Sequence, residues 1–568
     1  MLKLMKLLLK IVLWPLGILL VLLTVSICYG AVLYMQADMK QPQVDIDLSE
    51  YPLTVDTDSL KMCGGNSLVL NRYGIWESRL SGSPADRGTC FGVMAEDLLY
   101  FQEKVFVDQI KVFVPSESYL KFLRWVLEIF NRDMASYISD EFREEIYGIS
   151  LSCTHEFDVF GTPYERQLHY HAAHDIGHMM QEYMLVGCSS FATWDELSAD
   201  GNLLIGRNFD FWVGDDFARN KLILFVNPDS GYKYASVSWP GMTGVLSGMN
   251  EKGLTVTINA SKGSIPVASA MPISLLARQI LMYAGNIEEA YRIAAENSLF
   301  VSESLLIGSA ADGRAAIIEK TPDKIALFES DGQSVACTNH FQSDVYADDK
   351  HNVRNICESD SKYRYDRLCE LIDENVPMTP QKAADVLRNR AGKGGKDVGL
   401  ANEMTLNQSI AHHSVIFKPS ELKMWVTTSP WQSGEMICYD LNEVFSDTVP
   451  AGQSLVKEEL SIPADSAFIK DIYPRILKHR SDAILIRKAI WNGESLDNEL
   501  IEDFVANNPE YFESYMIAGD YHEERGETDL ALKYWKAALD KEFPYQEIKI
   551  DLELNKIRKY DKGQDAAL

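Results

Sequence analysis

The chain has 568 residues, of which 46% are hydrophobic and 24% are charged. This composition is typical of a globular protein and excludes a collagen-like or wholly disordered chain. Its 82 acidic residues outnumber 54 basic ones, which gives a net charge of −28. A chain this acidic repels phosphate backbones, and no basic stripe in the sequence offsets that repulsion, so we expect no nucleic-acid partner.

An apolar run lies near the start of the chain. Lys3, Lys6 and Lys10 precede 25 uncharged residues, Ile11–Met35, and about 20 helical residues suffice to span a bilayer. We therefore predict a transmembrane signal-anchor over residues 1–36, with the basic flank in the cytoplasm. The rest of this single-pass chain is then extracytoplasmic, on the periplasmic or extracellular side. A cleaved signal peptide is the alternative, although the run is long for one.

The nine cysteines show no CxxC spacing, so neither a zinc ribbon nor a thioredoxin-type motif is predicted. Disulfides are permitted in an oxidising compartment, and Cys63–Cys90 and Cys357–Cys369 are candidate bridges. Because the count is odd, at least one thiol is left free for chemistry.

Polar and mixed segments follow the apolar run. We expect a juxtamembrane linker over residues 37–62, which are polar and contain Pro and Asp. Residues 63–187 mix a strand-like segment with helical stretches, notably Tyr119–Phe130. From about Val186 to Phe445, strands and hairpins dominate, with Asp-Gly turns such as that at 200–201.

Two helices interrupt these hairpins. The first is predicted over Pro272–Ala284. The second is predicted over Thr379–Asn389, with Thr379 as N-cap and Pro380 as the first helical residue. Because helices lie between blocks of strands, the pattern predicts an α+β fold and not a doubly wound parallel sheet.

Residues 465–568 are predicted to form a helical tail. The spacing of a tetratricopeptide repeat (TPR) is matched by Tyr515, Gly519, Gly526, Ala531, Trp535 and Ala538. One repeat cannot bury its own face, and about three are needed for an independent array. We therefore expect TPR-like helices that cap the preceding domain, and a protein-binding array is the alternative.

The strongest chemical signal is the segment GCSSFATWDELSADGNLLIGRNFDF, which spans Gly187–Phe211. A hairpin centred on its Asp-Gly turn brings Arg207 and Asp210 back beside Cys188. The thiolate is the nucleophilic form of cysteine, and a neighbouring guanidinium group lowers the pKa of the thiol. Cys188 is therefore a candidate nucleophile, and the alternative is a buried structural cysteine.

Gly-Cys-Ser-Ser followed by Gly-Arg-Asn-Phe-Asp resembles the acyl-coenzyme A:6-aminopenicillanic acid acyltransferase family. These are N-terminal-nucleophile (Ntn) hydrolases, related to penicillin V acylase, conjugated bile salt hydrolase and acid ceramidase. The resemblance runs from about Gly64 to about Thr428. Its other pieces are Gly82-Ser-Pro-Ala-Asp-Arg-Gly88, the strand Asn250–Asn259, Thr338-Asn339-His340-Phe341 and the pair Arg364-Tyr365.

The resemblance implies a four-layer αββα sandwich over residues 188–450, with 63–187 as a pre-nucleophile segment. It also implies that Cys188 cleaves the Gly187–Cys188 bond and that its freed α-amino group then serves as general base. The resemblance also assigns further roles. Asp210 would hold the α-amine and Arg207 would support the nucleophile, while Asn259 would donate to the oxyanion and Asn339 would orient the nucleophile or the substrate. Arg364 is the last residue that the resemblance places in the catalytic site. Arg354 and Arg367 are nearby alternatives to Arg364.

Two features depart from the family pattern. Roughly 150 residues separate the apolar run from Cys188, which resembles the acyltransferase branch and not the bile-salt branch. No acyl-coenzyme A site is identifiable, and an extracytoplasmic domain would not meet that cofactor. We therefore expect no cofactor, and either hydrolysis or transfer between non-thioester donors at an N-acyl amide bond. Beside a bilayer, an amphiphilic small-molecule substrate is a reasonable hypothesis.

A histidine cluster supplies an alternative enzyme. Its members are His169, His171, His174, His178 and Asp175. Two imidazoles at i and i+4 have metal-ligand spacing. However, the segment reads HDxxH, and Asp reaches a metal-bound water less easily than the Glu of HExxH. The structural alternative is a buried, hydrogen-bonded helix face, so we assign no metal ligands here.

His412-His413 is expected to be a surface or strand-entry pair. The sequence has no P-loop, no GxGxxG after a strand and no GxSxG, so a nucleotide-dependent enzyme is not supported. We predict a membrane-anchored, extracytoplasmic Ntn cysteine amidohydrolase or acyltransferase. The alternatives are a metal-dependent hydrolase and a membrane-tethered, TPR-like interaction protein.

Overall fold

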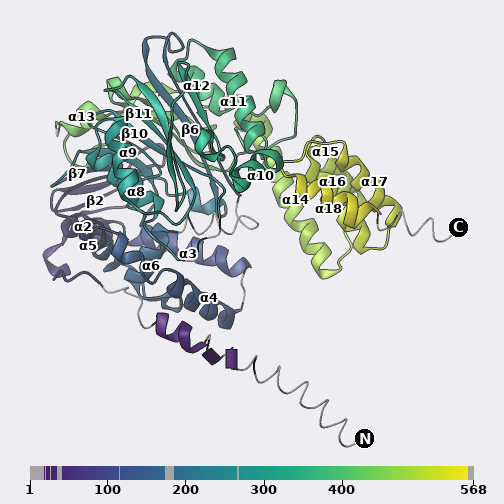
Figure 1. The fold of residues 1–568 in the computed structure, drawn as a ribbon, viewed down its shortest axis with the longest axis horizontal. Coiled ribbons are helices and arrows are strands. Elements are labelled where there is room, and N and C mark those ends of the chain that lie inside the picture. Colours follow the sequence, from purple (N-terminus) through teal and green to yellow (C-terminus); the bar gives the residue numbers. More distant parts are fainter. Residues whose placement is uncertain are drawn as a thin grey trace, which may run out of the picture.

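Two β-sheets form the centre of the computed structural model, and helices surround them (Figure 1). The structure describes residues 18, 21, 22, 24, 25, 27–34, 41–113, 116–172, 175, 185–264, 266, 268–446, 448–558 and 560. Most of the predicted anchor, residues 1–36, lies outside this description. Among the residues described, no helix is both long and apolar enough to cross a bilayer.

The first sheet has eleven strands in the order β1-β2-β3-β4-β7-β8-β9-β10-β11-β12-β13. β4 and β7 pair in parallel, and the other neighbours pair antiparallel. The strands are β1 (Leu53–Asp56), β2 (Leu60–Cys63), β3 (Asn66–Leu70), β4 (Trp76–Gly82), β7 (Leu222–Pro228), β8 (Tyr234–Ser238), β9 (Ser247–Asn250), β10 (Leu254–Ala260), β11 (Glu303–Ser309), β12 (Arg314–Lys320) and β13 (Ile325–Phe328).

The second sheet has seven antiparallel strands in the order β14-β5-β6-β15-β16-β17-β18. They are β5 (Leu185–Asp195), β6 (Gly201–Trp212), β14 (Ser334–Cys337), β15 (Ala411–Lys418), β16 (Lys423–Thr427), β17 (Met436–Asp440) and β18 (Val456–Ile462). The long β5–β6 hairpin turns at Gly201, whose φ of 75° is a conformation that favours glycine. The predicted Asp-Gly turn is therefore present.

The helices fall into three groups along the chain. Before the nucleophile strand lie α2 (Pro84–Met94), α3 (Glu96–Phe113), α4 (Glu117–Phe130), α5 (Asp140–Ser150) and α6 (Pro163–His171). Among the later strands lie α8 (Ile273–Tyr283), α9 (Ile287–Glu296), α10 (Lys350–Glu358), α11 (Ser361–Asn375), α12 (Pro380–Leu387) and α13 (Leu441–Phe445). The tail holds α14 (Tyr473–Asn492), α15 (Asn498–Asn507), α16 (Phe512–Glu524), α17 (Thr528–Leu539) and α18 (Gln546–Asp551).

Apolar side chains fill the space between the two sheets. Ile205 and Val415 of the second sheet share a buried cluster with Val237 and Leu306 of the first. On the second sheet's other face, a separate cluster joins its strands to α11 and α12. The second sheet is thus covered on both faces, and its central strands β6 and β15 are buried along almost their whole length.

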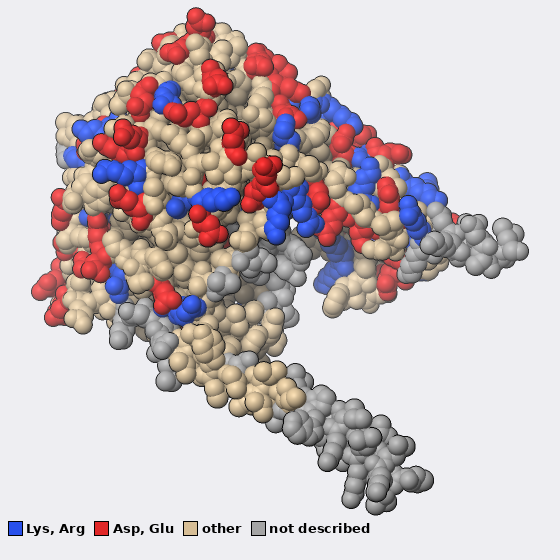
Figure 2. Space-filling model, in the orientation of Figure 1, with Lys and Arg blue, Asp and Glu red and all other residues tan. Residues whose placement is uncertain are grey.

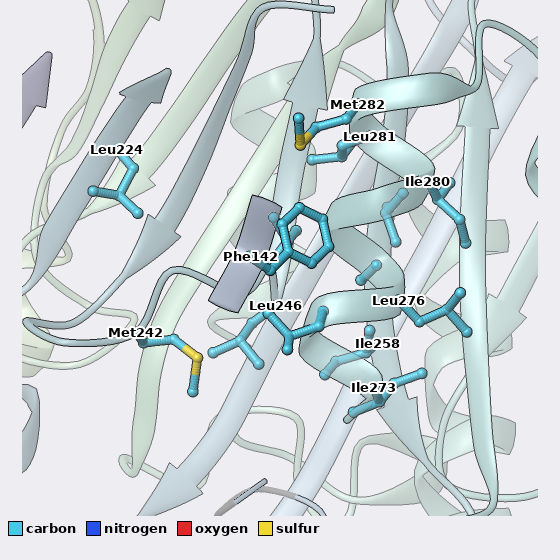
Figure 3. Close-up of a cluster of buried hydrophobic side chains, with 14 of the residues drawn as sticks. Phe142, Leu224, Met242, Leu246, Ile258, Ile273, Leu276, Ile280, Leu281 and Met282 are labelled. Atoms are coloured by element: carbon cyan, nitrogen blue, oxygen red, sulfur yellow. The ribbon is translucent and has the colours of Figure 1, made fainter. Parts of the chain in front are cut away.

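Helix α8 packs against the first sheet on the side away from the second. In Figure 3, Leu276 and Ile280 of α8 lie near Ile258 of β10 and Phe142 of α5, and all four are buried. Burying a side chain of this size stabilises the fold by about 1.5–3 kcal/mol. This core therefore ties the pre-nucleophile helices to the sheet that carries Asn259.

The fold confirms the predicted α+β class, since antiparallel pairing dominates both sheets. The predicted helices are present as α8 and α12, and the Thr379 side chain caps α12 by accepting from the Lys382 N–H. The later part of the predicted linker, residues 51–62, is not a linker, because β1 and β2 lie there and extend the first sheet. The alternation in Leu53–Asp56 accounts for this, since its apolar residues are half-buried and its polar ones exposed.

The Gly82–Gly88 motif has a packing role at the start of α2. The Ser83 side chain caps the helix and Pro84 follows as its first residue. At Gly88 a Cβ atom would lie 2.0 Å from the carbonyl oxygen of Glu145, so α2 and α5 approach each other as closely as backbones allow. The motif therefore fixes one helix pair in the pre-nucleophile segment.

A buried ion network lies beside this helix pair. The Glu145 carboxylate accepts from Arg87 of α2 at 2.8 Å and from Arg278 of α8 at 2.6 Å. Although burial raises the pKa of Glu145, Arg278 and Arg87 hold it down to about 2. Arg87 and Glu145 precede the 187–188 bond and Arg278 follows it, so the network joins the two sides of that bond.

The tail is helical, as predicted. Gly519 of α16 lies against Trp535 of α17, and a Cβ there would lie 2.3 Å from the indole ring. Ile486, Phe504 and Ile517 form a further buried cluster that joins α14, α15 and α16. On the face in Figure 2, acidic side chains are interspersed with Lys and Arg, in keeping with the net charge of −28.

Replacement of Gly88 tests the close α2–α5 contact. We expect Gly88→Ala to lower the free energy of unfolding by about 1–3 kcal/mol, because the added methyl group forces two backbones apart. Gly65→Ala is the matched control, since nothing lies within 4 Å of a Cβ at that exposed position. Denaturant unfolding of both variants measures the difference, and equal midpoints would contradict the role assigned to Gly88.

Candidate active site

Cys188 lies on β5, in the interior of the second sheet. In the β5–β6 ladder, Gly187 pairs with Asp210 and Cys188 pairs with Phe209. Cys188 is fully buried, and the chain runs through the 187–188 bond as continuous strand. The hairpin thus places the two halves of the motif side by side in the uncleaved chain.

A buried guanidinium group lies beside the Cys188 thiol. Arg207 Nη2 is 3.6 Å from the sulfur atom, and the Ile258 carbonyl and Ser247 hydroxyl accept from the same guanidinium. The Phe209 ring lies 4.5 Å from Arg207 Cζ. These contacts hold a positive charge next to the sulfur.

Two side chains from other elements hold the main chain of Cys188. Asn339, which follows β14, accepts the Cys188 N–H at 3.1 Å. Arg364 of α11 donates to the Cys188 carbonyl oxygen at 2.9 Å and to Asn339 Oδ1 at 2.7 Å. Asp360 in turn accepts from Arg364 Nε at 2.7 Å. The nitrogen and the carbonyl oxygen of Cys188 are both fixed by these bonds.

The structure distinguishes Arg364 from its two alternatives. Arg354 pairs with Glu358, and Arg367 pairs with Glu370 at 2.9 Å. Arg364 alone of the three donates to Cys188. The other two lie on α10 and α11, where their contacts are with carboxylates of their own helix.

Asn259 lies at the end of β10, on the sheet opposite the nucleophile strand. Its Oδ1 accepts the Ser190 hydroxyl at 3.0 Å. Its Nδ2 donates to the carbonyl oxygens of Cys337 at 3.2 Å and Thr338 at 3.3 Å. The amide is therefore close to β5, and in the uncleaved chain its N–H groups make two long contacts with main-chain oxygens.

Burial decides the protonation state of the thiol in the uncleaved chain. Burial raises the pKa of Cys188 to about 11, while Arg207 acts to lower it and Asp210 to raise it. We expected the guanidinium group to lower the pKa of this thiol. Its contribution has the expected sign but is smaller than the cost of placing a thiolate away from water. The uncleaved chain therefore holds a neutral thiol at pH 7.

The Asp210 carboxylate lies across the ladder from Gly187. Both of its oxygen atoms are buried, and neither has a hydrogen-bond partner among the described residues. Burial raises the pKa of Asp210 to about 8, against the opposing effects of Arg364 and Arg207. A buried carboxyl group without a partner is costly to keep, so its presence beside Cys188 is typical of a functional site.

Residues 197–429 match the family described as acyl-coenzyme A:6-aminopenicillanic acid acyl-transferase. This segment, which is less than half of the chain, is thus similar to that family. The matched range begins nine residues after Cys188 and contains the other residues that converge on it: Arg207, Asp210, Asn259, Asn339 and Arg364.

Two curated relatives match this chain at 24% identity. An uncharacterized protein of Archaeoglobus fulgidus aligns over 405 residues, which are 63% of this chain and 65% of that protein. Protein dcd1B of Dictyostelium discoideum aligns over 220 residues, 37% of this chain and 41% of its own length. The chain thus spans less than two thirds of either relative.

Two solved structures are similar at 14% identity. The Caenorhabditis elegans ortholog of N-acylethanolamine-hydrolyzing acid amidase covers 41% of this chain and 93% of its own, with a TM-score of 0.31. A mutant conjugated bile acid hydrolase from Clostridium perfringens covers 48% of this chain and 95% of its own, with a TM-score of 0.30.

The matched range also places a histidine beside Arg207. His413 Nε2 lies 2.8 Å from Ser247 Oγ and 3.4 Å from Arg207 Nη1. His412 and His413 are both buried, so the expected surface position was wrong, whereas the strand-entry position was right because β15 begins at Ala411. The reason is that β15 pairs with β6 and is covered on both faces, which no local pattern reveals.

The histidine cluster before the nucleophile is described in part. His169 and His171 are buried on α6, whereas His174 and His178 lie outside the described residues. His171 Nε2 accepts the Thr243 N–H at 3.0 Å, and Nδ1 donates to the Gln167 carbonyl at 2.7 Å. This ring therefore has the hydrogen-bonded structural role. Within the described residues, no three His, Cys, Asp or Glu side chains are grouped as metal ligands.

The raised pKa of Asp210 predicts a stability gain when its charge is removed. Folded, the carboxyl group keeps its proton up to about pH 8, whereas unfolded it loses it near pH 4. Stability is therefore lost as the pH rises between these values. In a Cys188→Ala background, we expect Asp210→Asn to raise the thermal midpoint increasingly from pH 5 to pH 8.5.

Thermal unfolding at the two pH values measures this effect. The control is Asp348→Asn, which removes an exposed carboxyl group. A difference between Cys188→Ala with and without Asp210→Asn that does not change with pH would contradict the burial argument.

Proposed function

We propose that this protein is an autoprocessing Ntn cysteine amidohydrolase or acyltransferase that acts on N-acyl amide bonds. The observation that carries the proposal is the set of contacts at Cys188. Asn339 holds its nitrogen, Arg364 its carbonyl oxygen and Arg207 its sulfur. The fourth neighbour, Asp210, has no hydrogen-bond partner among the described residues and lies opposite Gly187, where a new amine would form.

In the first step the chain acts on itself. The Cys188 sulfur attacks the Gly187 carbonyl carbon, the C–N bond breaks, and the thiol proton goes to the Cys188 nitrogen. Water then hydrolyses the resulting thioester, which leaves a Gly187 carboxylate, a free Cys188 α-amino group and a restored thiol. The high thiol pKa means that the proton has to leave during the attack and not before it.

In the second step the new α-amine serves as the base. An α-amino group has a pKa of about 7.7–8.0, so at neutral pH it can accept the thiol proton without a separate histidine. Asn339 already accepts from this nitrogen, and Asp210 can accept a second N–H from it. Asn259 donates to the oxyanion in exchange for one of its long carbonyl contacts, and such a donor is worth about a hundred- to a thousandfold in rate.

The same site supports hydrolysis and acyl transfer, because an acyl-thioester on Cys188 can pass to water or to an amine. The family description names an acyl-transferase. We propose a four-layer Ntn core over residues 188–450 and an N-acylated small molecule, amphiphilic in character, as the substrate.

Intact mass of the purified protein beside its Cys188→Ala variant tests this proposal. We expect a wild-type fragment that begins at Cys188, and its absence from the variant. The wild type should also release amine from N-acyl amides, and the variant should lose this by at least about a thousandfold, since it removes the nucleophile. A chelator should leave turnover unchanged. A wild type that stays one chain and is silent on amides would overturn the proposal.

We also propose that the N-terminal segment anchors the protein, with its catalytic part extracytoplasmic. In support, Ile18, Val21 and Val25 are each more than half exposed, and α4, whose Trp125 lies against Gly30, is beside this segment (Figure 1). A second support is the 2.8 Å separation of the Cys63 and Cys90 sulfur atoms, which suits the predicted bridge in an oxidising compartment. The bridge between Cys357 and Cys369 stays a prediction.

Membrane extraction and thiol mapping test the anchor and the compartment. We expect the full chain to resist alkaline carbonate, and Val21→Lys with Val25→Lys to release it, because each buried charge costs about 2.5–3.5 kcal/mol in a bilayer. Non-reducing peptide mapping should show Cys63 joined to Cys90. Release of the wild type by carbonate would contradict the membrane anchor. Two free thiols at Cys63 and Cys90, in protein taken from its native membrane, would contradict the oxidising compartment.

A further inference from the structure

A loop before β15 joins the helical tail to the proposed site. Residues 396–410 contain neither helix nor strand. Ala401 and Ser409, both non-glycine residues of this loop, have φ values of 57° and 55°. Such backbone conformations persist only where the surroundings hold them, so the loop is held in place by contacts from elsewhere.

Near its end, the loop packs against Gly187 of the Gly187–Cys188 bond. A methyl group built on the Gly187 Cα would lie 3.1 Å from Gln408 Nε2 and 3.5 Å from Arg364 Nη2. Gln408 is 3% exposed, and its Nε2 donates to the Glu403 carbonyl oxygen at 3.0 Å. Gln408 thus lies where a side chain on Gly187 would point.

The tail holds this loop at three points along its length. Tyr511, which precedes α16, contacts the Glu403 carboxylate through its hydroxyl at 3.1 Å. Arg480 of α14 donates to the Ser409 carbonyl oxygen at 3.0 Å. Asn508 exchanges two hydrogen bonds with the main chain of Leu400, at 2.8 and 3.0 Å.

We propose that the tail is a positioning unit of the active site, which sets Gln408 against the amide bond through the loop of residues 396–410. The inference rests on the proposed function. Once the Gly187–Cys188 bond has been cleaved, a substrate amide must reach the same sulfur atom, and its path lies beside Gln408. Gln408 is then a positioning residue for both reactions. The helices that resemble a TPR thus contact the chain's own catalytic loop, as expected for a capping tail.

Two buried tyrosines of the tail, one directly before α16 and one on it, provide a matched test. Tyr511→Phe removes the hydroxyl that holds Glu403. Tyr521→Phe is the control, because Tyr521 lies on α16, is 1% exposed, and bonds through its hydroxyl to the Leu496 main chain at 2.7 and 3.1 Å. Each change removes one hydroxyl group, with its two contacts, from the same helical unit, but only the Tyr511 hydroxyl contacts the loop.

The readouts are amide hydrogen exchange and the rate of Gly187–Cys188 cleavage in newly refolded protein. We expect Tyr511→Phe to speed exchange in residues 396–410 and to slow cleavage by about three- to tenfold. Tyr521→Phe should do neither, at a similar thermal midpoint. Gln408→Ala should slow cleavage at least as much as Tyr511→Phe and raise KM for amides more than it lowers kcat.

The outcomes separate this inference from the proposed function. Faster loop exchange with unchanged cleavage would overturn the positioning role of the tail, and unchanged exchange would overturn its hold on the loop. Equal effects of the two tyrosine variants would mean that the tail only stabilises the fold in general, and this would overturn the inference. If the wild type neither cleaves nor acts on amides, the proposed function fails, and the exchange comparison alone decides whether the tail holds the loop.

Discussion

The position of Cys188, the proposed nucleophile, depends on hydrogen bonds to its own main chain. Arg364 donates to the Cys188 carbonyl oxygen and Asn339 accepts the Cys188 N–H, while Asp360 fixes the guanidinium group. All of these groups are buried or nearly so, where a charged hydrogen bond is strong and an unmade one is expensive. Helix α11 therefore cannot move along the second sheet without disturbing Cys188, and the packing of that sheet sets the geometry of the site.

The site concentrates buried charged groups around Cys188. Arg207 and Asp210 are fully buried, and burial dominates the pKa of the thiol and of the aspartate. Such a site destabilises the fold, and well-packed elements around it have to offset the cost. The Arg87–Glu145–Arg278 network is one of these elements. It also holds the segment before the 187–188 bond to the segment after it, whether or not that bond is intact.

Local signals predicted much of this arrangement. The Asp-Gly turn and the spacing of Cys188, Arg207 and Asp210 sufficed for the hairpin, because antiparallel register follows from the turn. Thr379 and Pro380 likewise sufficed to predict where α12 begins, because an N-cap and a first-turn proline are local signals. The pattern did not reveal β1 and β2, since a strand at a sheet edge needs a partner strand to exist. It also misplaced His412 and His413, whose burial comes from β6 and not from their neighbours in sequence.

The sequence by itself determined the α+β class, the β5–β6 hairpin and the identity of the residues that converge on Cys188. Each of these depends on short-range spacing or on motifs that survive without the fold. Only the tertiary structure decided which arginine reaches Cys188, whether the thiol is ionised, and what the tail helices contact. Those properties depend on burial and on distances between segments hundreds of residues apart. Gln408 shows this most clearly, because its place beside Gly187 depends on a loop that Arg480 and Tyr511 of the tail hold in position.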